Sequence, residues 1–160
     1  MPDNSDKTFL TASARTKLEE ELAHLTTEGR EVIQDRIAEA RAHGDLRENA
    51  EYDTAKNDQG LMEARIRQLK HILENSEVRQ VEDSGKISVG TVATVVDGDG
   101  DELEFFVAPS ENKVAGTLLA SPDSPLGAAL IGAAPGDTVT YEAPGGTFSY
   151  QVKAVRVYEG

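Results

Sequence analysis

The sequence contains no cysteine and no long apolar run. Without cysteine the chain can form neither disulfides nor thiolate metal sites, which suits a reducing compartment. The longest weakly polar run, residues 126–135, is too short to span a bilayer, and residues 1–9 contain no apolar signal core. We therefore expect a cytoplasmic protein that makes no membrane contact.

Positive charge is also scarce. The 160 residues carry 16 Lys and Arg against 29 Asp and Glu, a formal net charge of −13. A surface this negative repels a phosphate backbone at long range, so the chain is not a free-standing DNA binder and any contact with DNA would be weak and indirect. With 38% hydrophobic and 28% charged residues, the chain can nevertheless fold and stay soluble.

The usual signatures of a stand-alone enzyme are missing. The sequence has no nucleophile elbow, P-loop or dinucleotide fingerprint. The three histidines, His24, His43 and His71, are too scattered to form a ligand set, so we assign them surface roles.

Two apolar stripes at helical spacing occupy the first half of the chain. The first contains Leu18, Leu22, Leu25, Gly29, Val32, Ile33, Ile37 and Ala40, and the second contains Tyr52, Ala55, Gln59, Met62, Ile66, Leu69 and Leu73. The second stripe alternates steps of three and four, which is typical of a coiled-coil seam. A turn near Leu46 would place Ala40 opposite Tyr52 and Ile37 opposite Ala55. We therefore predict an antiparallel hairpin whose arms, of roughly 30 residues, project about 45 Å.

In the second half the period changes to two and β-branched residues dominate. Strands are predicted from Thr91, Glu102, Asp137 and Thr147, and a short helix is predicted from Ser124. The chain is thus predicted to be α+β, with a helical hairpin over residues 1–83 and a small globular domain over residues 84–160.

Charged residues gather at the predicted tip of the hairpin. Four carboxylates surround one arginine, Arg47; they are Asp45, Glu48, Glu51 and Asp53. One interpretation is local capping, with Asp45 as N-cap of the second helix and Glu48 completing a capping box. Gly44 would then end the first helix.

A second interpretation is that Asp45 and Glu48 point beyond the tip and bind a hard cation such as Mg²⁺. Two carboxylates cannot complete the roughly six-oxygen shell of Mg²⁺. Such a tip would have to share the ion with acidic groups of another macromolecule.

The run GDLRENAEYDTAKNDQGLMEARIRQL, residues 44–69, resembles the Gre transcript-elongation factors, most closely the GreA branch. The resemblance continues upstream in FLTASARTKLEEEL and IAEARAHGDL, and downstream in SPDSPLGAALIGAAPGD. It implies an N-terminal antiparallel coiled coil joined to a C-terminal FKBP-like domain. One departure is Glu31, where many members have proline; together with Gly29, it implies a different bend in the first arm.

The resemblance also implies a mechanism. The globular domain would dock at the rim of the secondary channel of bacterial RNA polymerase, and the hairpin would enter the channel of a backtracked complex. There Asp45 and Glu48 would help hold a Mg²⁺ shared with the polymerase, beside the 3′ end of the nascent RNA. The polymerase would remain the enzyme, and the factor would act as a monomer.

Further roles follow from the resemblance alone. Arg47 and Lys56 would lie near the RNA, and Gly44, Asn49 and Tyr52 would support the tip. Asp123, Ser124 and Pro125 would form the loop that docks on the polymerase.

Two other functions remain open. The chain could be a channel-occupying regulator that inhibits the polymerase without stimulating cleavage, although such relatives usually carry altered tip acids. It could instead be a prolyl isomerase, but that requires an aromatic-lined pocket, and aromatic residues make up only 5% of the chain.

Overall fold

The computed structural model describes residues 7–43 and 49–159, which form two compact units. One unit runs from Arg15 to Asn75, and the other combines the residues up to Ala14 with those from Ser76 onward. The division therefore differs from the predicted break after residue 83. In the described parts of the chain, no helix is long and apolar enough to cross a membrane.

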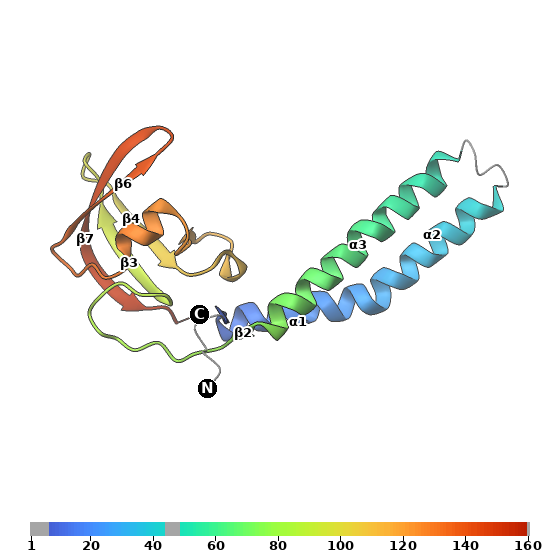
Figure 1. The fold of residues 1–160 in the computed structure, drawn as a ribbon, viewed down its shortest axis with the longest axis horizontal. Coiled ribbons are helices and arrows are strands. Elements are labelled where there is room, and N and C mark those ends of the chain that lie inside the picture. The colour runs from blue at the N-terminus through green and yellow to red at the C-terminus, as the bar shows by residue number, and fades with distance from the viewer. Residues whose placement is uncertain (1–6, 44–48, 160) are drawn as a thin grey trace. The chain divides into compact units, whose positions relative to one another are not determined.

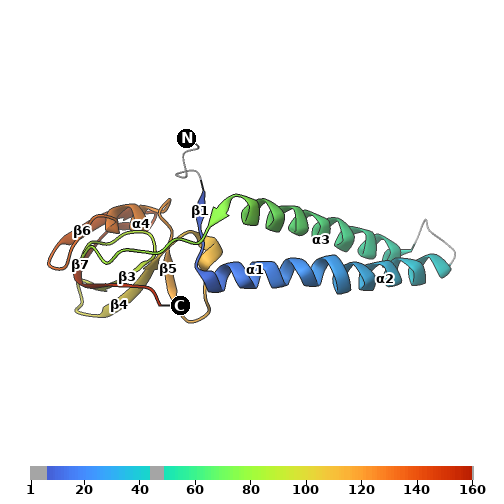
Figure 2. The same ribbon diagram turned by 90° about the horizontal axis from the view of Figure 1, so that it is seen from below.

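The first unit is an antiparallel helical hairpin (Figures 1 and 2). Its first arm consists of α1 (Ala12–His24), a π-helical turn (Leu25–Gly29) and α2 (Arg30–Ala42). Its second arm is α3 (Ala50–Glu74), which runs back beside the first. At 25 residues α3 is about 37 Å long, shorter than the predicted 45 Å.

The predicted seam holds the two arms together. Ile33, Ile37 and Ala55 form one buried cluster, against which Tyr52 and Met62 pack. This confirms that Ile37 and Ala55 face each other. Val32 is an exception: its side chain is 56% exposed, so its assignment to the seam was wrong.

The π turn accounts for an irregularity in the first stripe. Leu18 and Ala40 are both buried, yet they are 22 positions apart, one more than three heptads. A wider turn takes up the extra residue and keeps both in the seam. The hydroxyls of Thr26 and Thr27 donate to main-chain carbonyls four residues earlier, at 2.8 and 2.7 Å. The turn ends at Gly29, where the first stripe is interrupted.

Ion pairs between the arms reinforce the seam. They are Arg65–Glu21 (2.7 and 2.8 Å), Arg30–Glu63 (2.9 and 3.0 Å) and Arg36–Asp58 (2.9 Å). The first two are bidentate, and the guanidinium hydrogen bonds lower the pKa of Glu21 and of Glu63 below the ordinary value. Because the side chains are partly exposed, solvent screens these pairs and each adds little stability, but their geometry favours a single register.

The second unit is built on a five-stranded sheet in the order β5-β4-β3-β7-β6. The strands are β3 (Thr91–Val96), β4 (Glu102–Val107), β5 (Leu118–Ala120), β6 (Thr138–Ala143) and β7 (Gly146–Val157), and all neighbours are antiparallel except β4 and β5. Helix α4 (Pro125–Leu130) supplies the buried Leu130 to the core. The four predicted strands and the short helix are confirmed, and β5 is an addition.

The segment before the hairpin belongs to this second unit. Strand β1 (Thr8–Phe9) pairs in parallel with β2 (Ser76–Glu77), and Phe9 is buried in a cluster with Val92 and Phe106. The buried Asn112, in a short 3-10 helix (Ser110–Asn112), donates to the Phe9 carbonyl at 2.9 Å and accepts from the Thr11 amide at 2.7 Å. These long-range contacts explain why residues before Ala14 and between Ser76 and the predicted break belong to the globular unit.

Candidate functional site: the tip of the hairpin

The described part of the tip consists of two helix ends. Helix α2 ends at Ala42 and α3 begins at Ala50. Four of the predicted site residues, Gly44, Asp45, Arg47 and Glu48, lie outside the described residues. Their roles therefore stay predictions.

The N-cap of α3 is Asn49. Its side-chain oxygen accepts a hydrogen bond from the Tyr52 amide at 3.1 Å, and its own backbone is extended, as an N-cap requires. The hypothesis that Asp45 is the N-cap of this helix, with Glu48 in its capping box, was therefore wrong. Asparagine caps a helix as well as aspartate does. Asn49 directly precedes a first turn that contains Glu51 and Asp53, and these carboxylates interact favourably with the positive end of the helix dipole. The sequence thus contained two capping signals, and the later one is used.

Asn49 also contacts the other arm. Its side-chain amide nitrogen donates to the carbonyl oxygen of Ala40, a buried residue in the last turn of α2. Next to it, the guanidinium of Arg41 lies over the ring of Tyr52, 5.8 Å from the centroid. The predicted supporting residues Asn49 and Tyr52 are thus brought together where the two helices meet.

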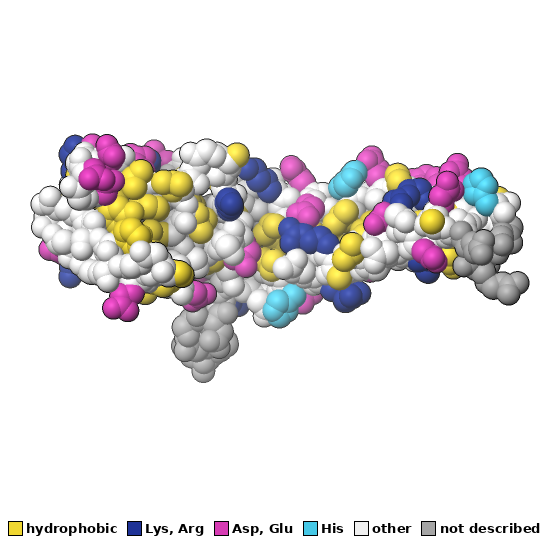
Figure 3. Space-filling model, turned by 90° about the horizontal axis from the view of Figure 1, so that it is seen from above, with side chains coloured by type: hydrophobic (Ala, Val, Ile, Leu, Met, Phe, Trp, Pro, Cys, Tyr) yellow, Lys and Arg dark blue, Asp and Glu magenta, His cyan; other side chains and the backbone are white. Residues whose placement is uncertain are grey.

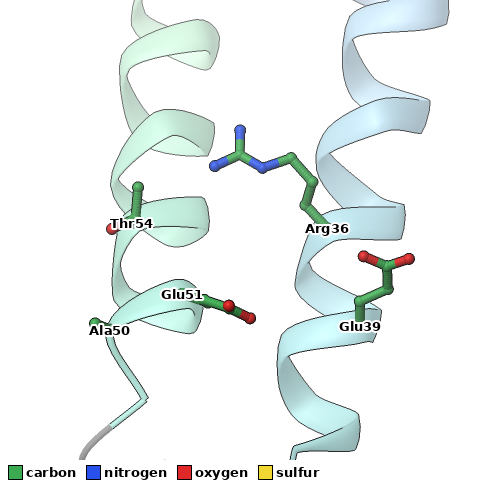
Figure 4. A pocket seen from close by; sticks show the side chains of 5 residues that line it. All are labelled: Arg36, Glu39, Ala50, Glu51 and Thr54. Carbon is green, nitrogen blue, oxygen red and sulfur yellow. The ribbon is translucent and has the colours of Figure 1, made fainter.

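A groove of about 420 Å³ lies between the arms near the tip (Figure 4). It is lined by Arg36, Glu39, Ala50, Glu51 and Thr54. Glu39 reaches into it from α2 and Glu51 from α3, with the Arg36 guanidinium between the helices. Since Arg36 is paired with Asp58 and Glu51 lies 3.5 Å from an imidazole nitrogen of His43, we assign the groove no separate chemistry.

The fit of Mg²⁺ rests on the donor type of the predicted ligands. Among residues 7–43 and 49–159, no three His, Asp or Glu side chains are grouped so that they could hold a metal ion. The predicted ligands Asp45 and Glu48 lie outside these ranges. Their carboxylates are the donor type that Mg²⁺ prefers, and two of them would supply only part of its shell.

The other RNA-facing candidate, Lys56, lies on the exposed side of α3. Its ammonium group donates to the side-chain oxygen of Gln59 at 3.0 Å, a contact within one helical turn. Such a bond is easily exchanged for another acceptor, so the predicted proximity to RNA stays a prediction.

The predicted docking residues surround the start of α4. Ser124 is its N-cap: the hydroxyl accepts from the Gly127 amide at 3.0 Å and donates to the Ser121 carbonyl at 2.6 Å. Asp123 and Pro125 are exposed on either side. Ser124 therefore has a structural role, and docking of this loop on the polymerase stays a prediction.

Aromatic rings of the globular unit pack on one another. Tyr141 stacks on Phe148 and on Tyr150, and Tyr150 lies against Phe105, at centroid distances of 5.6–5.9 Å. Hydrophobic side chains gather on one face of this unit (Figure 3). Three of the rings therefore stack between β6 and β7, and the ring of Phe105, in β4, is tilted by 58° against Tyr150.

Comparison with known families decides the affiliation. Residues 8–78 match the model of the N-terminal domain of GreA/GreB transcription elongation factors, and residues 82–157 match that of the GreA/GreB C-terminal domain. The chain belongs to the GreA/GreB family of transcription elongation factors. The resemblance noted in the sequence is confirmed, and the two matched regions correspond to the hairpin and the globular fold of a Gre-family protein.

Individual relatives agree with this affiliation. Transcription elongation factor GreA of Methylococcus capsulatus is 39% identical over 94% of this chain and 98% of the relative. The GreA of Alkalilimnicola ehrlichii is 41% identical over 94% and 98%, and that of Streptomyces coelicolor is 43% identical over 87% and 86%. A solved structure of Thermus aquaticus Gfh1 covers 95% of this chain and 99% of its own at 26% identity, with a TM-score of 0.41, too low to support an argument.

Proposed function

We propose that this Gre-family chain is an accessory factor of bacterial RNA polymerase that stimulates cleavage of backtracked RNA. The hairpin enters the secondary channel, and Asp45 and Glu48 help hold a catalytic Mg²⁺ in the active site of the polymerase. The globular unit docks at the rim of the channel through the loop around Asp123 and Pro125. The nascent RNA is cut by the polymerase, and the factor alone is inert.

The position of the helix cap carries this proposal. Asn49 provides the oxygen that α3 needs, so capping no longer explains why two carboxylates precede it. A role for Asp45 and Glu48 outside the hairpin becomes the simpler explanation of their charge. Membership of the GreA/GreB family of transcription elongation factors indicates that this role belongs to transcription elongation.

The chemistry follows from the number of ligands that the tip can offer. Asp45 and Glu48 would help hold a Mg²⁺, which would supply Lewis-acid activation of the attacking water and stabilise charge on the leaving oxygen. Asp45 and Glu48 supply too few oxygens to hold the ion alone, so they act only beside acidic groups of the polymerase. The bidentate ion pairs between the arms keep the hairpin in one register, which a probe of a buried site requires.

The test is RNA cleavage in stalled, backtracked complexes at limiting Mg²⁺. Wild-type factor should stimulate cleavage, and Asp45→Asn should lose on the order of 10- to 100-fold of that stimulation because an amide oxygen is a poorer ligand for Mg²⁺. Asp53→Asn is the matched control, since Asp53 is an exposed acid in the first turn of α3, and it should behave as wild type. Binding to polymerase should survive both substitutions.

Two results would overturn the proposal. If Asp45→Asn retains wild-type cleavage, the carboxylate is not a ligand, and a channel-occupying regulator that inhibits polymerase becomes the better interpretation. If the purified factor cuts RNA without polymerase, the chain is a nuclease in its own right.

A further inference from the structure

A groove of about 290 Å³ lies within the globular unit. Its lining includes Lys7, just before β1, and Arg79, just after β2, and we call these two cations its basic side. The lining also includes Glu111, in the short 3-10 helix, and Asp123, in the loop before α4, and we call these two carboxylates its acidic side. Because Asp123 is one of the predicted docking residues, the groove adjoins the surface that we expect to meet the polymerase.

Arg79 is held in place on the basic side. Its guanidinium lies over the ring of Phe9, 5.6 Å from the centroid, and its Nε atom is 3.2 Å from a carboxylate oxygen of Glu77. A guanidinium carries five N–H donors, and the side chain of Arg79 is 50% exposed, so one ion pair leaves donors for a second acceptor. Lys7 is also exposed and adds a second positive charge.

The acidic side depends on two parallel strands. Since β4 and β5 run in the same direction, the segments that follow them begin at the same edge of the sheet, and these segments contain Glu111 and Asp123. The loop of Asp123 is fixed by Ser124, whose hydroxyl donates to the Ser121 carbonyl at 2.6 Å. Both carboxylates therefore belong to segments that the sheet and this hydrogen bond hold in place.

Asn112 fixes the spacing between the two sides. Its side chain is 1% exposed, donates to the Phe9 carbonyl at 2.9 Å and accepts from the Thr11 amide at 2.7 Å. Asn112 directly follows Glu111, and Phe9 is the residue on which Arg79 stacks. The groove is thus formed before any partner arrives, which lowers the entropic cost of binding.

The charges of the two sides are not matched across the groove. In the part of the chain that the structure describes, no ion pair joins Lys7 or Arg79 to either carboxylate; Arg79 pairs with Glu77 on its own side. Opposite charges held apart at a fixed spacing are complementary to a ligand that carries both charges.

The size and charge of the groove limit what this ligand can be. A volume of about 290 Å³ lies at the lower end of the range for small-molecule pockets, roughly 300–1,000 Å³, so the groove suits a few side chains of a protein better than a whole cofactor. A second copy of this chain is a poor occupant, because two chains with a net charge of −13 repel each other.

We propose that this groove binds a protein segment of the polymerase in which acidic and basic side chains are neighbours. The acid of that segment pairs with Lys7 and Arg79, and its base pairs with Glu111 and Asp123. The inference rests on the proposed function, which identifies the polymerase as the partner. It adds Lys7, Arg79 and Glu111 to the docking surface and assigns them the choice of binding partner.

Two charge reversals of opposite sign test the inference. Lys7→Glu makes the chain more negative and Glu111→Lys makes it less negative, yet both should weaken binding to polymerase roughly 10-fold, since each replaces an attraction in the groove by a repulsion. Long-range electrostatics between the whole proteins would instead move the two affinities in opposite directions. Arg79→Gln tests the basic side again and should have a smaller effect, because it removes a charge without adding a repulsion.

Lys113→Glu and Glu142→Lys are the matched controls. Both side chains are exposed and lie outside the groove, and the two substitutions change the net charge as the groove variants do. At physiological salt they should bind within about 2-fold of wild type. Affinity of the full chain is measured by surface plasmon resonance on immobilised polymerase, and thermal melting checks that each variant is folded. A groove variant that does not fold is replaced by Lys7→Gln or Glu111→Gln.

The outcomes separate this inference from the proposed function. Affinities of Lys7→Glu and Glu111→Lys that equal those of the controls, or that move in opposite directions, would overturn the groove while cleavage by the wild-type factor upholds the proposed function. If the wild-type factor binds but stimulates no cleavage, the proposed function fails, and weaker binding by both variants still supports the groove. A wild-type factor that does not bind polymerase would overturn both.

Discussion

Asn49→Ala should destabilise the hairpin, whereas Asp45→Ala should not. Loss of the N-cap bond to the Tyr52 amide costs about 0.5–2 kcal/mol. The carbonyl of the buried Ala40 also loses a donor, which adds about 0.5–1.5 kcal/mol. Together the expected loss is roughly 1–3.5 kcal/mol. Asp45 does not cap α3, so its replacement should stay within about 0.5 kcal/mol.

Thermal melting of the full chain, followed by circular dichroism at a helical wavelength, measures this difference. The signal reports mainly on the hairpin, because α1, α2 and α3 contain most of the helical residues. In a unit of this size 1 kcal/mol shifts the midpoint by about 4–8 °C, so even the smaller loss is measurable. Equal midpoints for Asn49→Ala and wild type, or a large fall for Asp45→Ala, would show that α3 is capped differently and would refute the reasoning.

Two further predictions concern the units themselves. The arginine partners of Glu21 and Glu63 lower the pKa values of these carboxyl groups. The stability that the two ion pairs contribute is therefore complete above about pH 4.5 and is lost as the pH falls below it. Acid titration of the helical signal should accordingly be less steep in Glu21→Gln than in wild type. Phe9→Ala should lower the free energy of unfolding of the globular unit by about 3–5 kcal/mol in denaturant titrations, since Phe9 is only 4% exposed. Phe148, which is 43% exposed, should tolerate alanine far better. Equal effects of the two substitutions would mean that Phe9 lies outside the core.

The sequence by itself determined the architecture of both halves. The seam from Tyr52 to Leu73 predicted α3, and the alternation after Thr91 predicted four of the strands, because helical and strand periods are local properties of the chain. The long tip run and its flanks also predicted the family, which the comparisons confirm. The acids Asp45 and Glu48 were proposed from sequence, and their role stays a prediction.

The tertiary structure decided which of several local signals is used. Both Asp45 and Asn49 are good N-caps in isolation, and Asn49 is the one that also meets the carbonyl of Ala40 on the opposite arm. The π turn depends likewise on the partner helix, since the irregular first stripe becomes a continuous seam only when α3 lies against it. Phe9 joins a core assembled from residues more than 80 positions away. Such contacts depend on how segments far apart in the sequence pack together, and local periodicity does not predict them.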